Sequence, residues 1–203
     1  MKIGPKYKIA RRLGATVFEK TMTSKFALSQ ERRAKVKKRG RGATEYGKQL
    51  LEKQKVRMTY GISERQFANA VEEAMESKTV PPVEMLHRLL ELRLDNVIYR
   101  LGLAPTRRGA RQMVSHGHIT VNGVKTTVPS RRMRVGDRIA VREGSKTAGV
   151  FTGFAEKFME RETLPTWISW NPKAMEGGLS ELPAGRSADT AGDLVAVMSF
   201  YSR

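Results

Sequence analysis

The stretch from residue 93 to residue 143 constrains the fold of this chain most, because nearly every position in it carries a local structural signal. Asp95 can cap one short helix that ends at Gly102, and Thr106 can cap a second that ends at Gly117. Apolar residues recur in both segments at the spacing of a buried helical face. These residues are Val97, Ile98, Leu101, Ala110, Met113 and Val114.

Strand signals follow the second predicted helix. Residues 119–121 alternate apolar and polar side chains, Asn122-Gly123 is the strongest short hairpin signal, and residues 124–128 return. Gly136-Asp137 marks another turn before a further alternating strand at residues 139–141. The sequence therefore predicts an α+β module in which two short helices pack on a small twisted antiparallel sheet.

The second predicted helix carries arginines on the face opposite its apolar residues, and more arginines follow after the hairpin. The sequence has no carboxylate between Asp95 and Asp137 to neutralise them. Guanidinium groups fixed on a rigid helix bind phosphate oxygens bidentately and stack on bases, so we interpret this face as a surface for structured RNA. The alternative is an ordinary solvated charged face. The candidate residues are Arg107, Arg108, Arg111, His116, Arg131, Arg132 and Arg134.

Two runs in this stretch carry a resemblance to a known module. They are RLDNVIYRLGLA at residues 93–104 and ARQMVSHGHITVNG at residues 110–123, followed by PS and VGD. Together they resemble the S-four RNA-binding domain, which implies binding of folded RNA. That domain occurs in ribosomal proteins, RNA-modifying enzymes and some tRNA synthetases, so the flanking residues must identify the kind of protein.

The charge of the chain favours a polyanionic partner. Lys and Arg number 38 against 20 Asp and Glu, a net charge of +18. Residues 1–60 carry a net +14 and residues 93–146 a net +9, which suits an RNA bound in two places. A membrane-binding protein would more often concentrate its charge on one helix or tail. With no apolar run long enough for a membrane span and no signal peptide, we expect a protein of the cytosol.

Metal and disulfide chemistry find little support in the composition. The chain has no cysteine, which excludes disulfides and thiolate metal sites. Its three histidines, His87, His116 and His118, are too scattered for a dedicated metal cage. We therefore expect no metal site and no cofactor.

The sequence before this module is expected to form two structural parts. Residues 1–43 are a basic, extended N-terminal segment with too few apolar residues to become ordered without RNA. Against that interpretation, Ile9, Leu13, Val17 and Phe18 are spaced as one apolar helical face. Residues 44–92 predict a domain of three helices. Tyr60-Gly61 ends the first, Ser63 and Gln66 form a capping box for the second, and Pro81-Pro82 precedes the third.

Residues 147–203 lack a core of their own and are expected to pack back on the helical domain, so that residues 93–146 form an inserted module. Phe154, Phe158 and Met159 indicate a short helix. Residues 176–193 are loop-like, and residues 194–200 indicate a short apolar strand or extended segment. We expect Trp167 and Trp170 to anchor a core or an interface rather than to stack on bases.

The flanking motifs resolve which kind of protein this is. They are GPK at residues 4–6, Arg11-Arg12, YGKQLLEKQKVRMTYGISERQF at residues 46–67, PTW at residues 165–167 and a terminal YSR. In this order they resemble the universal S-four family of small-subunit ribosomal proteins, in its bacterial or organellar form, from about Gly4 to Arg203.

The chain departs from that family's pattern at the N-terminus. Many members carry a four-cysteine zinc knuckle there, but Tyr7 and Ala10 occupy its first two positions in this sequence. Zinc is therefore excluded, and packing by Tyr7, Ile9 and Leu13 must stabilise the region. The run RGRGATE before Tyr46 also departs from the family, so the path of residues 35–45 is open.

The resemblance implies a primary binder of small-subunit rRNA at a multi-helix junction in the five-prime domain, which nucleates assembly of the subunit body. It also implies a place near the mRNA entry path beside the third and fifth small-subunit proteins, with an effect on decoding accuracy. The ribosome could be cytoplasmic or organellar, and no membrane or small-molecule substrate is implied. With the basic pair Arg11 and Arg12, the implied RNA contacts are Lys48, Lys53, Lys55, Arg57, Arg107, Arg108, Arg111 and His116. The expected protein contacts lie in the C-terminal segment at Asp189, Val195, Val197 and Tyr201.

Arg93-Leu94-Asp95 resembles the Arg-Leu-Asp of pseudouridine synthases, but such an enzyme needs a separate catalytic domain that this length cannot hold. The sequence therefore predicts that the chain is not an enzyme. The remaining alternative is a free-standing RNA chaperone or regulator. Sedimentation with small subunits on a sucrose gradient would distinguish the two.

Overall fold

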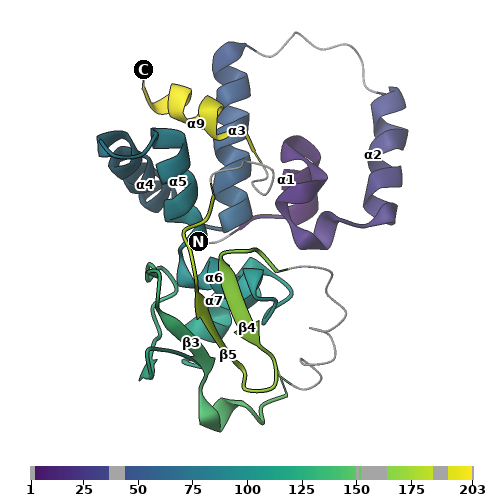
Figure 1. The fold of residues 1–203 in the computed structure, drawn as a ribbon. Coiled ribbons are helices and arrows are strands. Elements are labelled where there is room, and N and C mark those ends of the chain that lie inside the picture. Colours follow the sequence, from purple (N-terminus) through teal and green to yellow (C-terminus); the bar gives the residue numbers. More distant parts are fainter. Residues whose placement is uncertain (1–2, 37–43, 150, 152–163, 185–191, 203) are drawn as a thin grey trace. The chain divides into compact units, whose positions relative to one another are not determined.

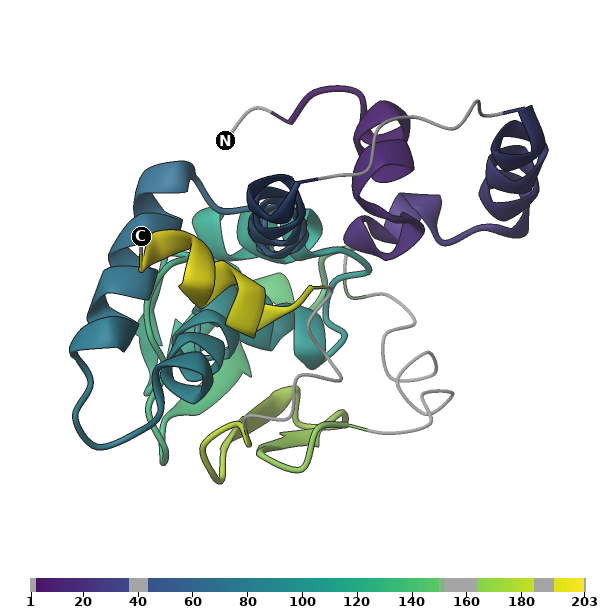
Figure 2. The same ribbon diagram turned by 90° about the horizontal axis from the view of Figure 1, so that it is seen from above.

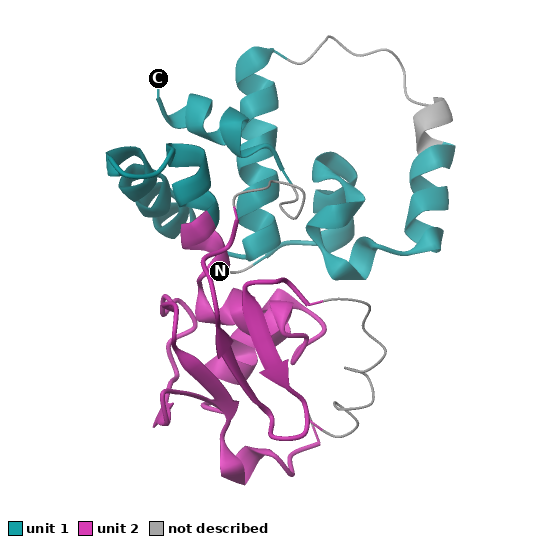
Figure 3. Cartoon of the chain, viewed as in Figure 1, with its two compact units in different colours: residues 1–87, 185–203 teal, residues 88–184 magenta. Residues whose placement is uncertain are grey.

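The computed structural model describes residues 3–36, 44–149, 151, 164–184 and 192–202. It divides the chain into two compact units, coloured in Figure 3. Unit 1 comprises residues 1–87 and 185–203, and unit 2 comprises residues 88–184. The predicted segment 147–203 is thus shared between the units, and its Trp167 belongs to the core of unit 2 rather than to the helical domain.

Unit 1 is helical throughout its described part (Figure 1). The three helices expected between residues 44 and 92 are present, each begins where predicted, and the first ends at Tyr60 as predicted. The Thr44 hydroxyl accepts from the Gly47 N–H, and the Ser63 hydroxyl accepts from the Gln66 N–H. Gly61 ends the first of them in the left-handed conformation. The elements are α1 (Lys6–Leu13), η1 (Ala15–Val17), η2 (Glu19–Thr21), α2 (Ser24–Val36), α3 (Glu45–Tyr60), α4 (Glu64–Glu76), α5 (Pro82–Glu91) and α9 (Leu194–Tyr201). The last four residues of α5 belong to unit 2.

The N-terminal segment is not extended, so that prediction is wrong for its described part. Gly14, with φ 113°, ends α1 and splits the expected apolar face between a helix and two 3-10 turns. The Thr21 hydroxyl donates to the Ala15 and Phe18 carbonyls and closes those turns. The resulting core contains Ala10, Leu13, Val17, Phe18 and Phe26. Residues 37–43 lie outside the described residues.

Aromatic packing contributes where the zinc ligands of the family would stand. The Tyr7 ring lies 5.9 Å from that of Phe26, whereas Ile9 packs at the margin of the core and Leu13 within it. The ammonium group of Lys6 lies 5.5 Å from the centre of the Phe18 ring. Helices α1 and α2 are therefore held together by the packing of their side chains.

The C-terminal helix α9 corrects a second prediction, because residues 194–200 were expected to be a strand. The periodicity of a continuous apolar run does not distinguish a helix from a strand. The preceding Asp193 favours the helix, because it caps the helix N-terminus. Its carboxylate accepts from the N–H groups of Val195 and Ala196 at 2.8 and 3.3 Å. The helix packs against α3 and crosses it (Figures 1 and 2). Gly192 permits this approach, since a Cβ there would lie 2.9 Å from the Val56 side chain.

Unit 2 confirms the predicted α+β class. Its five antiparallel strands run in the order β2-β1-β3-β5-β4. Two helices lie on one face of this sheet (Figure 1), and their apolar side chains join those of the strands in one buried core. The elements are α6 (Leu94–Arg100), α7 (Arg107–Ser115), β1 (Ile119–Val121), β2 (Val124–Lys125), β3 (Arg138–Val141), η3 (Glu143–Ser145), β4 (Ile168–Asn171) and β5 (Glu176–Leu179).

The local signals of unit 2 are mostly confirmed. The Thr106 hydroxyl accepts from the Gly109 N–H at the start of α7. Asn122 and Gly123 both have positive φ, 52° and 79°, as a two-residue hairpin requires. Gly102 and Gly117 also have positive φ after their helices.

The hairpin of β4 and β5 is a third correction, because residues 176–193 were predicted to be loop-like. The sequence Glu-Gly-Gly-Leu of β5 has neither alternation nor strand propensity. Glycine is nevertheless required there, since a Cβ at Gly177 would lie 2.1 Å from the Ser169 carbonyl oxygen and 2.8 Å from the Trp170 ring. As predicted, Trp167 is buried in the core, and Trp170 packs against it. The helix expected at Phe154, Phe158 and Met159 lies outside the described residues.

We expect Gly177→Ala to lower the free energy of unfolding by roughly 1–3 kcal/mol, because the new methyl group must displace backbone atoms of β4. Denaturant unfolding of the whole chain measures this change. Gly144→Ala is the matched control, since a Cβ at Gly144 meets nothing within 4 Å. Equal stability of the two variants would contradict the close approach of the two strands.

Candidate nucleic-acid interface

The start of α6 and the loop at residues 129–133 are joined by backbone hydrogen bonds in unit 2. The N–H of Leu94 donates to the Arg131 carbonyl at 2.8 Å, and the N–H of Asp95 donates to the Pro129 carbonyl at 3.0 Å. The N–H of Met133 donates to the Leu92 carbonyl at 2.8 Å. The loop that carries Arg131 and Arg132 is therefore fixed beside the first turn of α6.

Asp95 does not cap α6, which corrects the sequence interpretation. The N-cap is Arg93, and Asp95 lies in the first turn with its side chain 3% exposed. Its carboxylate accepts from Arg93 Nε and Nη2 at 3.2 Å each. It also accepts from Arg111 Nε at 2.9 Å and from Arg111 Nη2 at 2.6 Å. Asp95 is thus an ion-pair partner of two arginines.

Asn96, the next residue of α6, binds the arginine one turn earlier on α7. Its side-chain oxygen accepts from Arg107 Nε at 2.9 Å, and the Arg107 guanidinium lies 4.3 Å from the centre of the Tyr99 ring. The Asn96 amide group donates to the carboxylate of Glu91 at 3.0 Å, and Arg100 binds that carboxylate through two hydrogen bonds. Arg107 therefore lies at the end of a buried polar chain.

The predicted RNA-contacting residues of unit 2 consequently fall into two groups. Arg108, His116 and Arg132 are exposed, as expected for an outward face. Arg107 and Arg111 are half-buried and form hydrogen bonds with residues of α6. Arg131 is also half-buried, and its guanidinium group donates to the Thr126 hydroxyl at 3.3 Å. The expectation that no carboxylate neutralises the arginines is wrong for Arg111. Arg93 was not among the candidates, although its place beside Asp95 in the sequence could have indicated it.

The basic candidates of α3 in unit 1 are largely paired within the protein. Lys53 and Arg57, with side chains 12% and 17% exposed, form ion pairs with Glu64 of α4. Lys55 pairs with Glu52, and the exposed Lys48 pairs with Glu45. The contacts place Lys53 and Arg57 toward α4, whereas Lys48 is open to solvent.

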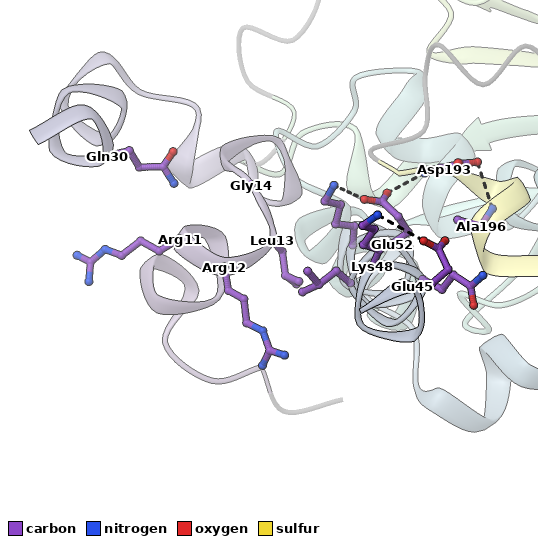
Figure 4. Close-up of a pocket in the computed structure, with 13 residues that line it drawn as sticks. Arg11, Arg12, Leu13, Gly14, Gln30, Glu45, Lys48, Glu52, Asp193 and Ala196 are labelled. Atoms are coloured by element: carbon purple, nitrogen blue, oxygen red, sulfur yellow. Dashed lines mark hydrogen bonds and ion pairs between the residues drawn. The ribbon is translucent and has the colours of Figure 1, made fainter. Parts of the chain in front are cut away.

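Arg11, Arg12, Lys48 and Lys55 nevertheless line one cavity of about 700 Å³ in unit 1. Figure 4 shows Arg11 and Arg12 extending from α1, apart from the carboxylate pairs of α3. The first residues of α9 complete the wall, where Glu52 accepts from the Asp193 N–H at 2.9 Å. Four predicted basic residues therefore line the same cavity, but the side chains of Arg11 and Arg12 point away from Lys48 and the carboxylates of α3.

The candidate protein contacts lie on α9, apart from Asp189, which is outside the described residues. Val195 is 60% exposed, whereas Val197 is fully buried against the rest of unit 1. The Tyr201 hydroxyl donates to Glu64 at 3.0 Å, and the Lys53 ammonium lies 4.5 Å from the centre of the Phe200 ring. Of the named candidates described here, Val195 is the one that α9 presents to solvent.

Glu64 is the centre of a charged cluster that holds α9. Burial raises its pKa, but hydrogen bonds from Lys53 and Tyr201 and the charges of Lys53 and Arg57 outweigh burial and hold the pKa below its ordinary value. Burial also raises the pKa of Tyr201, and the neighbouring Glu64 charge adds to that rise. The Tyr201 hydroxyl therefore keeps its proton and acts as a donor at neutral pH.

The part of the chain that the structure describes contains neither a candidate membrane span nor a candidate metal site. None of its helices has the length and apolar character needed to cross a membrane. Among the described residues, no group of three or more histidine, aspartate or glutamate side chains is placed to hold a metal ion.

Two family models match the chain. The model described as "Ribosomal protein S4/S9 N-terminal domain" matches residues 1–91, and the model described as "S4 domain" matches residues 92–139. The two matches meet near the boundary at which the structure separates unit 1 from unit 2.

Curated relatives extend the likeness over nearly the whole chain, and each is named small ribosomal subunit protein uS4. The protein from Roseiflexus castenholzii is 42% identical over 204 residues, 99% of this chain and 98% of the relative. That from Lactiplantibacillus plantarum is 40% identical over 206 residues, 98% and 97% of the two chains. That from Parabacteroides distasonis is 43% identical over 183 residues, 89% and 88%. This chain therefore belongs to the uS4 family of ribosomal proteins, which are structural proteins and not enzymes.

Proposed function

We propose that this chain is a structural protein of the small ribosomal subunit that binds rRNA directly and early in assembly. Its site is a multi-helix junction in the five-prime domain, where binding nucleates the subunit body. The assembled protein lies near the mRNA entry path, beside the third and fifth small-subunit proteins, and contributes to decoding accuracy. Its ribosome is that of the cytoplasm or of an organelle.

The observation that carries the proposal is the meeting of two arginine-bearing elements at the start of α6. Backbone hydrogen bonds fix the loop of Arg131 and Arg132 there, and Asp95 holds Arg111 of α7 against the same turn. Guanidinium groups held on rigid elements bind phosphates with little loss of side-chain entropy. This arrangement suits a folded RNA whose phosphates have fixed positions.

The second basic region supports binding in more than one place. Arg11 and Arg12 are exposed on α1, and Lys48 is exposed on α3. Because Lys53 and Arg57 are paired with Glu64, we assign them a smaller share of RNA binding than Arg11, Arg12 and Lys48. Because Lys55 is half-buried and pairs with Glu52, we assign it an intermediate share of RNA binding.

The C-terminal helix supports a contact with neighbouring proteins. Its Val195 side chain is exposed, and the exposed Tyr46 of α3 contacts the same helix through Phe200, with the two rings 5.4 Å apart. Aromatic and apolar side chains exposed on a rigid helix pair are typical of protein interfaces. Asp189 stays a candidate from the sequence alone.

The proposal is tested by expressing a tagged copy and separating ribosomal particles on a sucrose gradient. The tagged chain should sediment with small subunits in a one-to-one ratio, and the purified chain should protect sites in the five-prime domain of its rRNA from chemical probes. A tagged chain that stays at the top of the gradient would instead indicate a free regulator.

Arg108→Ala should weaken rRNA binding by about 1–3 kcal/mol, because this exposed arginine of α7 would lose a charge-assisted pair with a phosphate. Filter binding with a five-prime domain transcript at moderate salt measures the loss. Lys173→Ala removes the same charge from an exposed turn of unit 2 and serves as the control. If both variants bind alike, α7 is not part of the RNA interface.

Deleting residues 194–203 should leave rRNA binding intact and impair recruitment of the neighbouring small-subunit proteins, because α9 carries the proposed protein contact. Stepwise reconstitution on rRNA, read by mass spectrometry of the bound proteins, measures this recruitment. A folded truncated chain that no longer binds rRNA would show that α9 serves the RNA interface instead.

The Glu64 cluster should make the attachment of α9 sensitive to acid. Because the folded-state pKa of Glu64 is lowered, its stabilising contribution is present above the unfolded value of 4.5 and is lost as pH falls below it. Glu64→Gln should cost at most about 1 kcal/mol at pH 7, since the side chain is half exposed. The difference from wild type in denaturant unfolding should shrink as pH falls below 4.5, and a difference that stays constant would contradict this account. Glu72→Gln removes an exposed carboxylate from the same helix and is the matched control.

A further inference from the structure

Asp95 is an acidic residue at the centre of a basic surface, and its position is unusual. Its side chain is 3% exposed and has two arginine partners, Arg93 and Arg111. A buried ion pair contributes little net stability compared with apolar residues of similar volume, because both charges lose their hydration. A carboxylate also repels the phosphates of RNA. Net stability therefore does not explain an acidic residue at this position, beside arginines that are proposed to bind phosphates.

The geometry of the contacts made by Asp95 suggests a role in positioning arginine side chains. Asp95 and Asn96 are consecutive on α6, and they bind Arg111 and Arg107, which lie four residues apart on α7. Residues at this spacing project from the same side of a helix, with roughly 5–6 Å between their Cβ atoms. Two adjacent acceptors therefore hold two arginines in a fixed register, one helical turn apart.

The contacts with Arg111 are directional as well as charged. Asp95 Oδ2 accepts from both Nε and Nη2 of Arg111, so the plane of the guanidinium group is set by the carboxylate. The Arg111 side chain is still 29% exposed. A guanidinium group has five N–H donors on different edges, so binding a carboxylate on one edge is compatible with binding a phosphate on another.

We propose that Asp95 is a positioning residue for RNA binding, which orients the Arg111 guanidinium toward an RNA phosphate through the two hydrogen bonds to Oδ2. The proposal rests on the proposed rRNA-binding function and adds a role for an acidic residue to it. Asp95 does not touch the RNA itself. It lowers the entropy that Arg111 would otherwise lose on binding.

Positioning and simple electrostatics predict opposite results for Asp95→Asn. This change raises the net charge by one and nearly preserves the shape of the side chain. If only charge matters, the variant binds RNA more tightly. If Asp95 positions Arg111, the variant binds about tenfold more weakly. The slope of log K against log salt then becomes shallower by roughly 0.7–0.9, the value of one lost phosphate contact.

The experiment uses the full-length chain and a transcript of the five-prime domain of small-subunit rRNA, titrated at several salt concentrations. Glu143→Gln is the matched control, because it raises the net charge by the same amount at a side chain that is 87% exposed in the same unit. The control should bind as tightly as wild type or more tightly, with an unchanged slope. Asp95→Asn binding like this control would overturn the proposal.

Arg111→Lys provides a second variant that does not disturb the buried carboxylate charge. Lysine keeps the positive charge but not the planar fork, so binding should weaken about as much as in Asp95→Asn. Adding Asp95→Asn to Arg111→Lys should then weaken binding little further, because the positioned group is already lost.

Circular dichroism and thermal melting show which variants are folded. If Asp95→Asn does not fold, Arg111→Lys decides alone, and wild-type affinity and slope in that variant would overturn the proposal. Wild-type chain that fails to bind the transcript refutes the proposed function instead, so the two failures are distinguishable.

Discussion

The ion pairs of the buried Asp95 carboxylate are the interaction on which the arginine-bearing surface of unit 2 depends. The side chain of Asp95 connects α6 with Arg111 of α7. Its backbone N–H connects α6 with the loop at residues 129–133. Arg93 and Arg111 both bind this carboxylate, and their charges would repel each other if no anion lay between them. One negative charge therefore permits a concentration of positive charge that the helices could not otherwise carry close together.

In unit 1 the comparable position is held by Glu64. Its carboxylate forms ion pairs with Lys53 and Arg57 of α3 and accepts a hydrogen bond from the Tyr201 hydroxyl of α9. One carboxylate of α4 thus joins three helices. The arrangement also explains why two basic residues of the strongly positive α3 contribute to internal contacts. In both units acidic residues organise an excess of cations, and the remaining exposed cations are available for a polyanion.

Much of this organisation could be predicted from the sequence, because the signals were local. Capping at Ser63 and Thr106 and the hairpin at Asn122-Gly123 depend on residues a few positions apart, and all three are confirmed. The errors arose where distant contacts decide the structure. β5 is specified by the close approach of β4 at Gly177, which no local pattern reveals. Asp95 was interpreted as a cap because its partner Arg111 lies sixteen residues away.

The chain path has a consequence for biosynthesis. Unit 2 is continuous from residue 88 to residue 184, whereas unit 1 is completed by residues 185–203 after the chain has left it. A growing polypeptide emerges from its N-terminus, so unit 2 can close its core before α9 exists. Until then the buried sites of Val197 and Leu194 on unit 1 are uncovered. The first-made part of the protein thus reaches its final form only after α9 has been synthesised.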